Sequence, residues 1–407
     1  MKIKYFIFGK NWVFFTLVLL ALLPVACQKD NDPPIETNES GDLIHATSIG
    51  TYSASTIQTI LNAVSADFNL ELKYAVEVVK IVYYTTDPSG NVVQASGALM
   101  VPKQVDDLPS ICFHHGTETK RSDVASAGPL ATGEGFAGMI MASIGFLTFE
   151  PDYLGLGDSD ILHPYLYANS YAEASIDMLT AGVSYCAQNG ITLDWDLYLG
   201  GYSEGGYATL AVQKEIEKQF SFEFNLIANA PQAGPYDLHE TVKYFINLPD
   251  YPEPSFMAYM VTAYNDIYNW NRIDKFFLAP YADMMDNLFD GTNSPGEINN
   301  SLPDKISLLF KESFLNGYND GSETEFVNAV KENTLLDWTP LTPIRFYHSN
   351  ADEIVSYQNS LTAVDNLKTH GGTDISLVTI DGLKHGEASL IAITRMTEWF
   401  DSLKNNK

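Results

Sequence analysis

A glycine-rich stretch at residues 199–206 constrains the fold of this chain more than any other part of the sequence. It lies between an apolar run that predicts a short buried strand and a longer segment whose periodicity predicts a helix. Its Gly-x-Ser-x-Gly pattern places Gly201 and Gly205 around Ser203, where they let the strand and helix backbones approach closely. Such a turn presents the Ser203 hydroxyl at a helix N-terminus, and the N–H of Glu204 points into the same space.

Short apolar runs alternate with helical patterns along most of the chain. The runs lie at residues 111–113, 146–149, 197–201, 226–230, 344–349 and 375–380. Helical patterns lie at residues 136–144, 171–188, 207–220, 357–368 and 389–403. Further upstream, the pattern predicts a helix over 53–68 and a β-hairpin over 70–84 and 92–101. We therefore expect an α/β fold with a mixed, mostly parallel sheet and helices on both faces.

Residues 231–340 break this alternation. The segment is aromatic and acidic, and its apolar residues have helical spacing in several places. An unstructured loop of this length is implausible inside a compact domain. We expect a mainly helical cap inserted into one core domain, which is formed by residues 48–230 and 341–407.

The N-terminus has the pattern of an export signal. Three lysines among the first ten residues precede an apolar segment that is too short for a comfortable membrane span and ends in Ala26 and Cys27. This pattern resembles a bacterial lipoprotein signal, which implies that residues 1–26 are removed and that Cys27 is lipidated. Plain secretion, with Cys27 as an incidental thiol, is the alternative.

The segment at residues 27–47 is polar and predicts a tether. Its beginning, residues 28–32, resembles the acidic export tags of surface lipoproteins. We expect a protein that is exported and anchored through Cys27 to the bacterial cell envelope, at the outer membrane.

The formal net charge of the 407-residue chain is −28. Binding to nucleic acid requires clustered Lys and Arg, so this charge argues against a nucleic-acid partner. No obligate protein partner is evident. Of the remaining cysteines, Cys112 and Cys186 are expected to be buried free thiols, although an exported chain permits a disulfide.

Two further candidate residues follow strands downstream of Ser203. Asp352 comes after the run at 344–349, with Glu353 as the rival acid, and His385 comes after the run at 375–380. A serine hydroxyl becomes nucleophilic when a neutral imidazole takes its proton, and a buried carboxylate must orient that imidazole. The order Ser, Asp, His, with each residue at the carboxyl end of a strand, predicts a catalytic triad.

Acyl transfer also requires N–H donors for the oxyanion that forms. The Glu204 N–H is one candidate, and the N–H of Thr117 or of Gly116 is the second, because these residues follow the strand at 111–113. His114 and His115 could suggest a metal pair, but adjacent residues of a strand point to opposite faces. We expect no metal and no other cofactor.

Together, the motifs at residues 114–117, 151–157 and 201–206 resemble those of the α/β-hydrolase superfamily, and more narrowly its secretory-lipase branch. The resemblance covers roughly residues 70–405. It implies an esterase or lipase that acts on a small-molecule ester or acylated substrate through an acyl-enzyme. It also implies that His115, Asp152, Tyr153 and Tyr202 shape the substrate pocket. The alternatives are a serine peptidase of the same fold and a non-catalytic binding lipoprotein.

Overall fold

The computed structural model describes residues 38–64, 69–130, 132–220 and 224–406. The expected signal peptide at 1–26 and Cys27 lie outside the described residues. The part of the tether at residues 43–47 is not a tether, because it belongs to strand β1 (Leu43–Tyr52). Most side chains of β1 are only half-buried or exposed, so its sequence lacks the apolar run by which a buried strand can be recognised.

One sheet of nine strands organises the described part of the chain, in the order β1-β2-β3-β5-β4-β6-β7-β8-β9. β1, β2 (Val76–Thr86), β3 (Val92–Pro102) and β5 (Leu147–Pro151) pair antiparallel in that order. The pairs from β5 to β9 are all parallel. The parallel strands besides β5 are β4 (Leu108–His114), β6 (Leu193–Tyr202), β7 (Asn225–Gln232), β8 (Ile344–Ser349) and β9 (Ile375–Ile380). The expected hairpin and mostly parallel sheet are both present.

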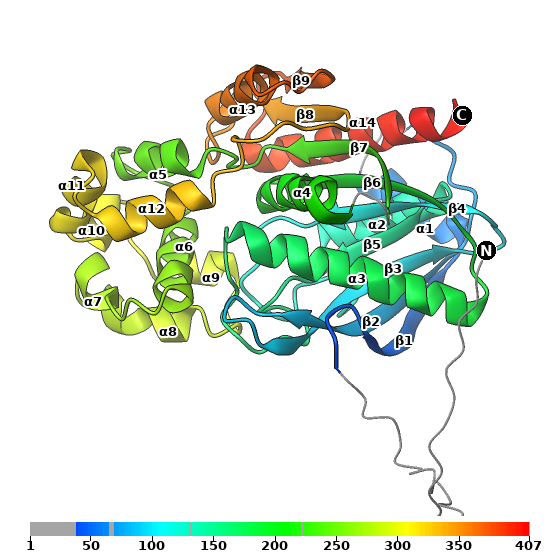
Figure 1. Ribbon diagram of the computed structural model, residues 1–407, viewed down its shortest axis with the longest axis horizontal. Coiled ribbons are helices and arrows are strands. Elements are labelled where there is room, and N and C mark those ends of the chain that lie inside the picture. Colours follow the sequence, from blue (N-terminus) through cyan, green and yellow to red (C-terminus); the bar gives the residue numbers. More distant parts are fainter. Residues whose placement is uncertain (1–37, 65–68, 131, 221–223, 407) are drawn as a thin grey trace, which may run out of the picture. The chain divides into compact units, whose positions relative to one another are not determined.

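Helices cover both faces of this sheet (Figure 1). One face packs against α1 (Ala54–Val64), α2 (Gly133–Ser143) and α14 (His385–Asn405). The other packs against α3 (Ala168–Asn189), α4 (Glu204–Glu215) and α13 (Tyr357–Thr369). The central strands are buried on both sides, which is why they read as continuous apolar runs.

A group of helices is inserted between β7 and β8 and lies beyond the carboxyl edge of the parallel strands (Figure 1). The longer ones are α5 (Leu238–Ile246), α6 (Pro254–Ile267), α11 (Glu312–Asp320) and α12 (Thr324–Glu332). The shorter α-helices are α7 (Ile273–Phe276), α8 (Met285–Leu288), α9 (Pro295–Asn299) and α10 (Ile306–Leu309). Aromatic side chains such as Phe276, Phe314 and Phe326 pack together at their centre.

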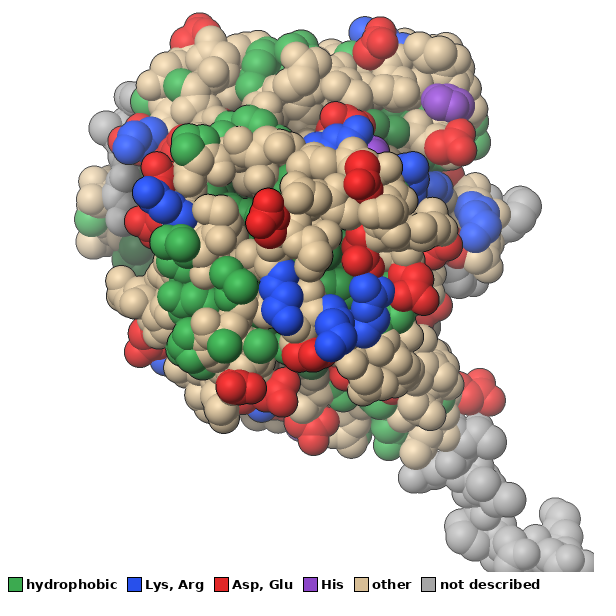
Figure 2. Space-filling model, turned by 90° about the vertical axis from the view of Figure 1, so that its left-hand side faces the viewer, with side chains coloured by type: hydrophobic (Ala, Val, Ile, Leu, Met, Phe, Trp, Pro, Cys, Tyr) green, Lys and Arg blue, Asp and Glu red, His purple; other side chains and the backbone are tan. Residues whose placement is uncertain are grey.

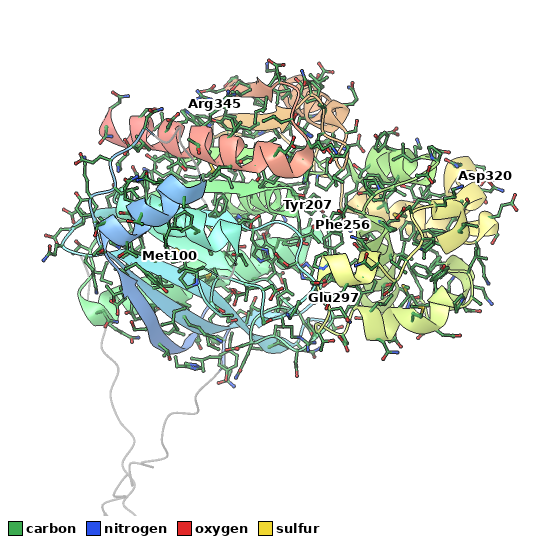
Figure 3. All side chains as sticks on the ribbon, turned by 180° about the vertical axis from the view of Figure 1, so that it is seen from behind. Met100, Tyr207, Phe256, Glu297, Asp320 and Arg345 are labelled. Carbon is green, nitrogen blue, oxygen red and sulfur yellow. The ribbon has the colours of Figure 1, made fainter. Side chains whose placement is uncertain are left out.

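The inserted helices rest on the carboxyl end of the core. Tyr207 of α4 donates a hydrogen bond to the carbonyl of Asn333, directly after α12. Tyr207 and Phe256 lie at the junction between the sheet and the inserted helices (Figure 3). The inserted helices and the core beneath them share one apolar cluster. The insertion therefore covers the carboxyl ends of the strands, where ligand sites of α/β sheets lie.

On the face shown in Figure 2, Lys and Arg side chains lie among Asp and Glu side chains, and apolar side chains form separate patches. Among the described residues, no helix has the length and apolar character needed to cross a membrane.

Cys112 and Cys186 are both free and buried. Burial raises the pKa of the Cys186 thiol to about 12. The disulfide that the sequence permits between these two cysteines is therefore not present.

Candidate active site

Ser203 lies in a strained turn between β6 and α4. Its φ is 58° and its ψ is −119°, a conformation that is uncommon for a residue with a side chain. The flanking glycines are required by space. A Cβ at Gly201 would lie 2.4 Å from the Gly205 carbonyl oxygen, and a Cβ at Gly205 would lie 2.0 Å from the His114 carbonyl oxygen. The turn therefore holds the Ser203 side chain at the carboxyl edge of the sheet.

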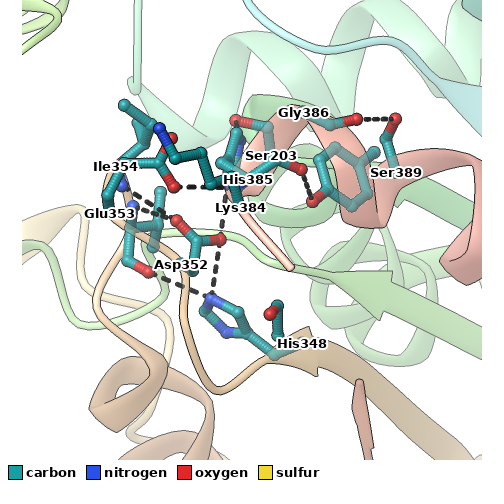
Figure 4. Close-up of polar contacts among 12 residues, drawn as sticks. Ser203, His348, Asp352, Glu353, Ile354, Lys384, His385, Gly386 and Ser389 are labelled. Atoms are coloured by element: carbon teal, nitrogen blue, oxygen red, sulfur yellow. Dashed lines mark hydrogen bonds and ion pairs between the residues drawn. The ribbon is translucent and has the colours of Figure 1, made fainter. Parts of the chain in front are cut away.

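The structure places the three expected catalytic side chains in one hydrogen-bonded row (Figure 4). Ser203 Oγ lies 2.9 Å from His385 Nε2, and His385 Nδ1 lies 2.6 Å from Asp352 Oδ2. Asp352 follows β8, as expected. His385 is not in a loop before the last helix, because α14 begins at His385 rather than at residue 389. The imidazole thus projects from the first turn of a helix that packs on the sheet.

Asp352 fits the acid position better than Glu353. Its side chain is fully buried, and its Oδ1 accepts hydrogen bonds from the N–H groups of Ile354 and Val355. Burial alone would raise the pKa of this carboxyl, but hydrogen bonds with His348 and His385 outweigh it and lower the pKa. Glu353 instead accepts a hydrogen bond from the backbone N–H of His385. Asp352 is therefore held as a carboxylate beside the imidazole.

His348 is a residue of this site that the sequence did not reveal. It is the fifth residue of β8, and its Nε2 lies 3.1 Å from Asp352 Oδ2 and 3.0 Å from the Val355 carbonyl oxygen. The Ser360 hydroxyl lies 2.7 Å from Nδ1. Since Nε2 faces two acceptors, it carries the proton and donates to Asp352. The four-residue spacing to Asp352 is a signal that could have pointed to this role.

The expected oxyanion donors lie beside Ser203. Glu204 is the first residue of α4, so its N–H is one of the helix's unpaired N-terminal amides. A Cβ at Gly116 would lie 3.8 Å from Ser203 Cβ, which places the Gly116–Thr117 peptide next to the serine. Within the described part of the chain, the N–H groups of Gly116 and Thr117 hydrogen-bond to no acceptor.

The four residues expected to shape the substrate pocket make hydrogen bonds or ring contacts within the protein. Asp152 is fully buried and accepts hydrogen bonds from the hydroxyls of Ser96 and Ser126. The Tyr202 hydroxyl donates to the His385 carbonyl. The other two, His115 and Tyr153, contact one another with ring centroids 4.1 Å apart. None of the four is among the residues that line the cavity beside Ser203.

The two adjacent histidines have separate surroundings. His114 Nε2 lies 2.9 Å from the Ser175 hydroxyl, and burial lowers the pKa of His114 to about 3. His115 Nδ1 lies 2.7 Å from the Gly116 carbonyl oxygen. Among the described residues, no three His, Cys, Asp or Glu side chains are gathered as metal ligands.

A small apolar cavity adjoins Ser203 under the inserted helices. Its volume is about 30 Å³. Its wall is contributed by Ser203 and Glu204 on the core side and by α5 and α6 on the other side, through Leu238, Val242, Phe245, Phe256, Met257 and Met260. A volume of this kind holds roughly two water molecules. The sequence did not single out these cap residues, because their common position arises from the packing of two helices.

Comparison with known proteins gives matches in structure only: no protein-family model matches the chain, and no curated protein matches its sequence. The rice cell-wall-degrading esterase LipA of Xanthomonas oryzae is similar over 91% of this chain and 100% of its own, with a TM-score of 0.82 and 26% identity. A protein of Legionella pneumophila assigned as a hydrolase is similar over 88% of this chain and 97% of its own, with a TM-score of 0.83 and 27% identity. Candida antarctica lipase A shares the fold at 17% identity, with a TM-score of 0.65 over 85% of this chain and 78% of its own.

Proposed function

We propose that this chain, which has the α/β-hydrolase fold of the esterases and lipases it resembles, hydrolyses carboxylic esters with Ser203 as the nucleophile. The observation that carries the proposal is the unbroken row of hydrogen bonds from Ser203 through His385 to Asp352. The row lies at the carboxyl edge of the sheet, beside a cavity and beside the N–H groups of Gly116 and Thr117, which have no acceptor among the described residues. A non-catalytic binding protein has no need of this combination.

The reaction follows from the positions of these groups. His385 Nε2 takes the proton of Ser203 Oγ as the oxygen attacks the ester carbonyl, and the carbonyl oxygen becomes an oxyanion. The N–H of Glu204 and that of Thr117 or Gly116 stabilise this oxyanion. The bond to the alcohol oxygen then breaks, and His385 returns its proton to the leaving alcohol. Water, deprotonated by His385, releases the acid from Ser203 in the same way.

Asp352 and His348 keep the imidazole ready for both steps. The Asp352 carboxylate accepts the Nδ1 proton of His385, which leaves Nε2 free to act as the base. His348 donates a second hydrogen bond to the same carboxylate oxygen. This bond favours the charged form of Asp352.

The cavity beside Ser203 favours a short acyl group. Its lining does not include His385, whose Nε2 must reach the alcohol oxygen, so the cavity lies on the acyl side. At about 30 Å³ the cavity is small, with room for roughly two water molecules. We therefore propose acetyl or propionyl esters as preferred substrates.

Lipidation of Cys27 and anchoring at the outer membrane remain part of the proposal.

The test is hydrolysis of p-nitrophenyl esters from acetate to palmitate by the purified protein, by Ser203→Ala and by Ser389→Ala. Ser389 lies on α14 close to the site, and its hydroxyl donates to the helix carbonyl of Gly386, so it is a matched control. Turnover that is lost in Ser203→Ala and kept in Ser389→Ala supports the proposal. Full activity of Ser203→Ala, or no turnover of any ester by the folded protein, would overturn it.

A further inference from the structure

We propose that Tyr153 and Tyr171 are positioning residues that hold the two oxyanion donors from behind. The inference rests on the proposed ester hydrolysis, because it concerns the donors of that reaction. Tyr153 follows β5, and Tyr171 lies in the first turn of α3. Both rings are only 1% exposed, so neither can contact a substrate.

Tyr171 fixes the donor that follows the nucleophile. The side chain of Glu204 is completely buried, and its Oε1 accepts a hydrogen bond of 2.7 Å from the Tyr171 hydroxyl. The same hydroxyl accepts a hydrogen bond from the N–H of Leu166. The hydroxyl also lies 3.2 Å from His163 Nε2. Its single proton goes to Glu204 Oε1, which is the nearer of the two at 2.7 Å.

His163 completes the attachment of Glu204. Its Nε2 lies 2.9 Å from the same Oε1 atom, and its Nδ1 lies 2.6 Å from the Leu154 carbonyl oxygen. The Glu204 side chain is thus bound to His163, between β5 and α3, and to Tyr171 of α3. A buried carboxyl is costly unless it is hydrogen-bonded or paired, and these two residues supply its partners.

Tyr153 fixes the donor on the opposite side. Its hydroxyl donates a hydrogen bond of 2.9 Å to the His115 carbonyl oxygen, and His115 Nδ1 donates to the Gly116 carbonyl oxygen at 2.7 Å. A peptide unit is planar and trans, so its N–H points away from its C=O. Fixing these two carbonyls therefore sets the directions of the N–H groups of Gly116 and Thr117.

The two tyrosines belong to one buried unit. Their rings pack edge to face with centroids 4.9 Å apart, and the Tyr153 ring also packs on His115 at 4.1 Å. Tyr153 has a φ of 70°, which is unfavourable for a bulky residue and must be maintained by its surroundings. This backbone conformation turns the ring between His115 and Tyr171. One aromatic contact therefore joins the residues that hold the two donors.

Donors held in this way act when the oxyanion forms and contribute little to substrate binding. Replacing either tyrosine by phenylalanine keeps the ring and removes only the hydroxyl. We expect Tyr153→Phe and Tyr171→Phe to lower kcat for p-nitrophenyl acetate about tenfold with KM almost unchanged, less than the roughly 10²–10³-fold loss on removing a donor outright. Affinity for a trifluoromethyl ketone, which mimics the tetrahedral intermediate, should fall by the same factor as kcat/KM.

Tyr318→Phe is the matched control. Tyr318 is equally buried, and its hydroxyl lies 2.9 Å from His239 Nδ1 in the inserted helices. Its loss should leave kcat and the ketone affinity unchanged. Unchanged kcat and ketone affinity in both site variants, while the wild type shows Ser203-dependent turnover, would overturn the positioning role and leave ester hydrolysis standing. A lower melting temperature with kcat and KM both impaired would show a merely structural role. Absence of wild-type turnover would overturn the proposed function, and the positioning role with it.

Discussion

Asp352 and Glu353 are neighbours with the same chemistry, and the structure gives them different partners. Asp352 faces the imidazole of His385, whereas Glu353 contacts its backbone N–H. We expect Asp352→Asn to lower kcat by roughly 10⁴-fold, because the amide favours the wrong imidazole tautomer. Glu353→Gln should cause a much smaller loss. Steady-state kinetics with p-nitrophenyl acetate compare the two, and a greater loss in Glu353→Gln would contradict the assignment of the acid.

Individual residues also show where sequence reasoning succeeds and where it fails. The proximity of Ser203 and His385 could be expected because their local patterns and their order along the chain match the requirements of the proposed chemistry. His348 was missed because its role depends on the direction of one side chain at a strand end. Tyr153 was expected in the pocket, but a sequence motif does not indicate on which side of a loop a ring packs.

At the scale of secondary-structure elements, the crossing of β6 and α4 depends on Gly205. A Cβ there would lie 2.0 Å from the His114 carbonyl oxygen, and a backbone atom cannot move aside as a flexible side chain can. Gly205→Ala should therefore lower the free energy of unfolding by roughly 4 kcal/mol or more. Gly296→Ala in α9, where a Cβ meets open space, should change it by no more than about 1 kcal/mol. Denaturant titration of both variants gives the comparison, and equal effects would contradict this packing.

Strand β5 contains a buried carboxyl that makes stability depend on pH. Burial raises the pKa of Glu150 well above its usual range, and Glu134 and Asp152 add to the effect. The native state therefore keeps a proton that the unfolded chain releases above a pKa of about 4.3. The stability due to this proton is complete below that pH and is lost as pH rises, by up to about 1.4 kcal/mol per pH unit.

Glu150→Gln removes this titration. The free energy of unfolding of the variant, relative to wild type, should rise steadily between pH 5 and pH 8. Denaturant titrations at several pH values measure this difference. A difference that does not change with pH would show that Glu150 does not retain its proton on folding.

Helix α6 sets the size of the cavity through Met257 and Met260. Met257→Ala should enlarge it and move the preferred p-nitrophenyl ester from acetate towards butyrate or hexanoate. Met285 is buried in the inserted helices but does not line the cavity, so Met285→Ala is the control and should leave the preference unchanged. Chain-length profiles of the three proteins test this. If Met257→Ala had the same chain-length profile as the wild type, the acyl group would bind outside this cavity.

For the molecule as a whole, the core could be predicted more completely than the inserted helices. Parallel strands are buried on both faces and helices cross between them, so their apolar runs are visible in the sequence. The insertion between β7 and β8 could be recognised as helical, but its cavity is formed by residues of α5 and α6 that are distant from Ser203 in sequence. The sequence predicts a tether up to residue 47, but residues 43–47 belong to β1 at the sheet edge. Pairing with β2, rather than an apolar composition, makes this segment a strand.

We propose that the row of hydrogen bonds through His385 to Asp352 activates Ser203. The most direct measurement is mass spectrometry of the protein after treatment with a fluorophosphonate, which reacts with activated serines, followed by peptide mapping. We expect one adduct per chain, located on Ser203, and its formation should be strongly slowed in His385→Ala. Absence of an adduct on Ser203 in the folded protein, or labelling that is equally fast without His385, would contradict the claim.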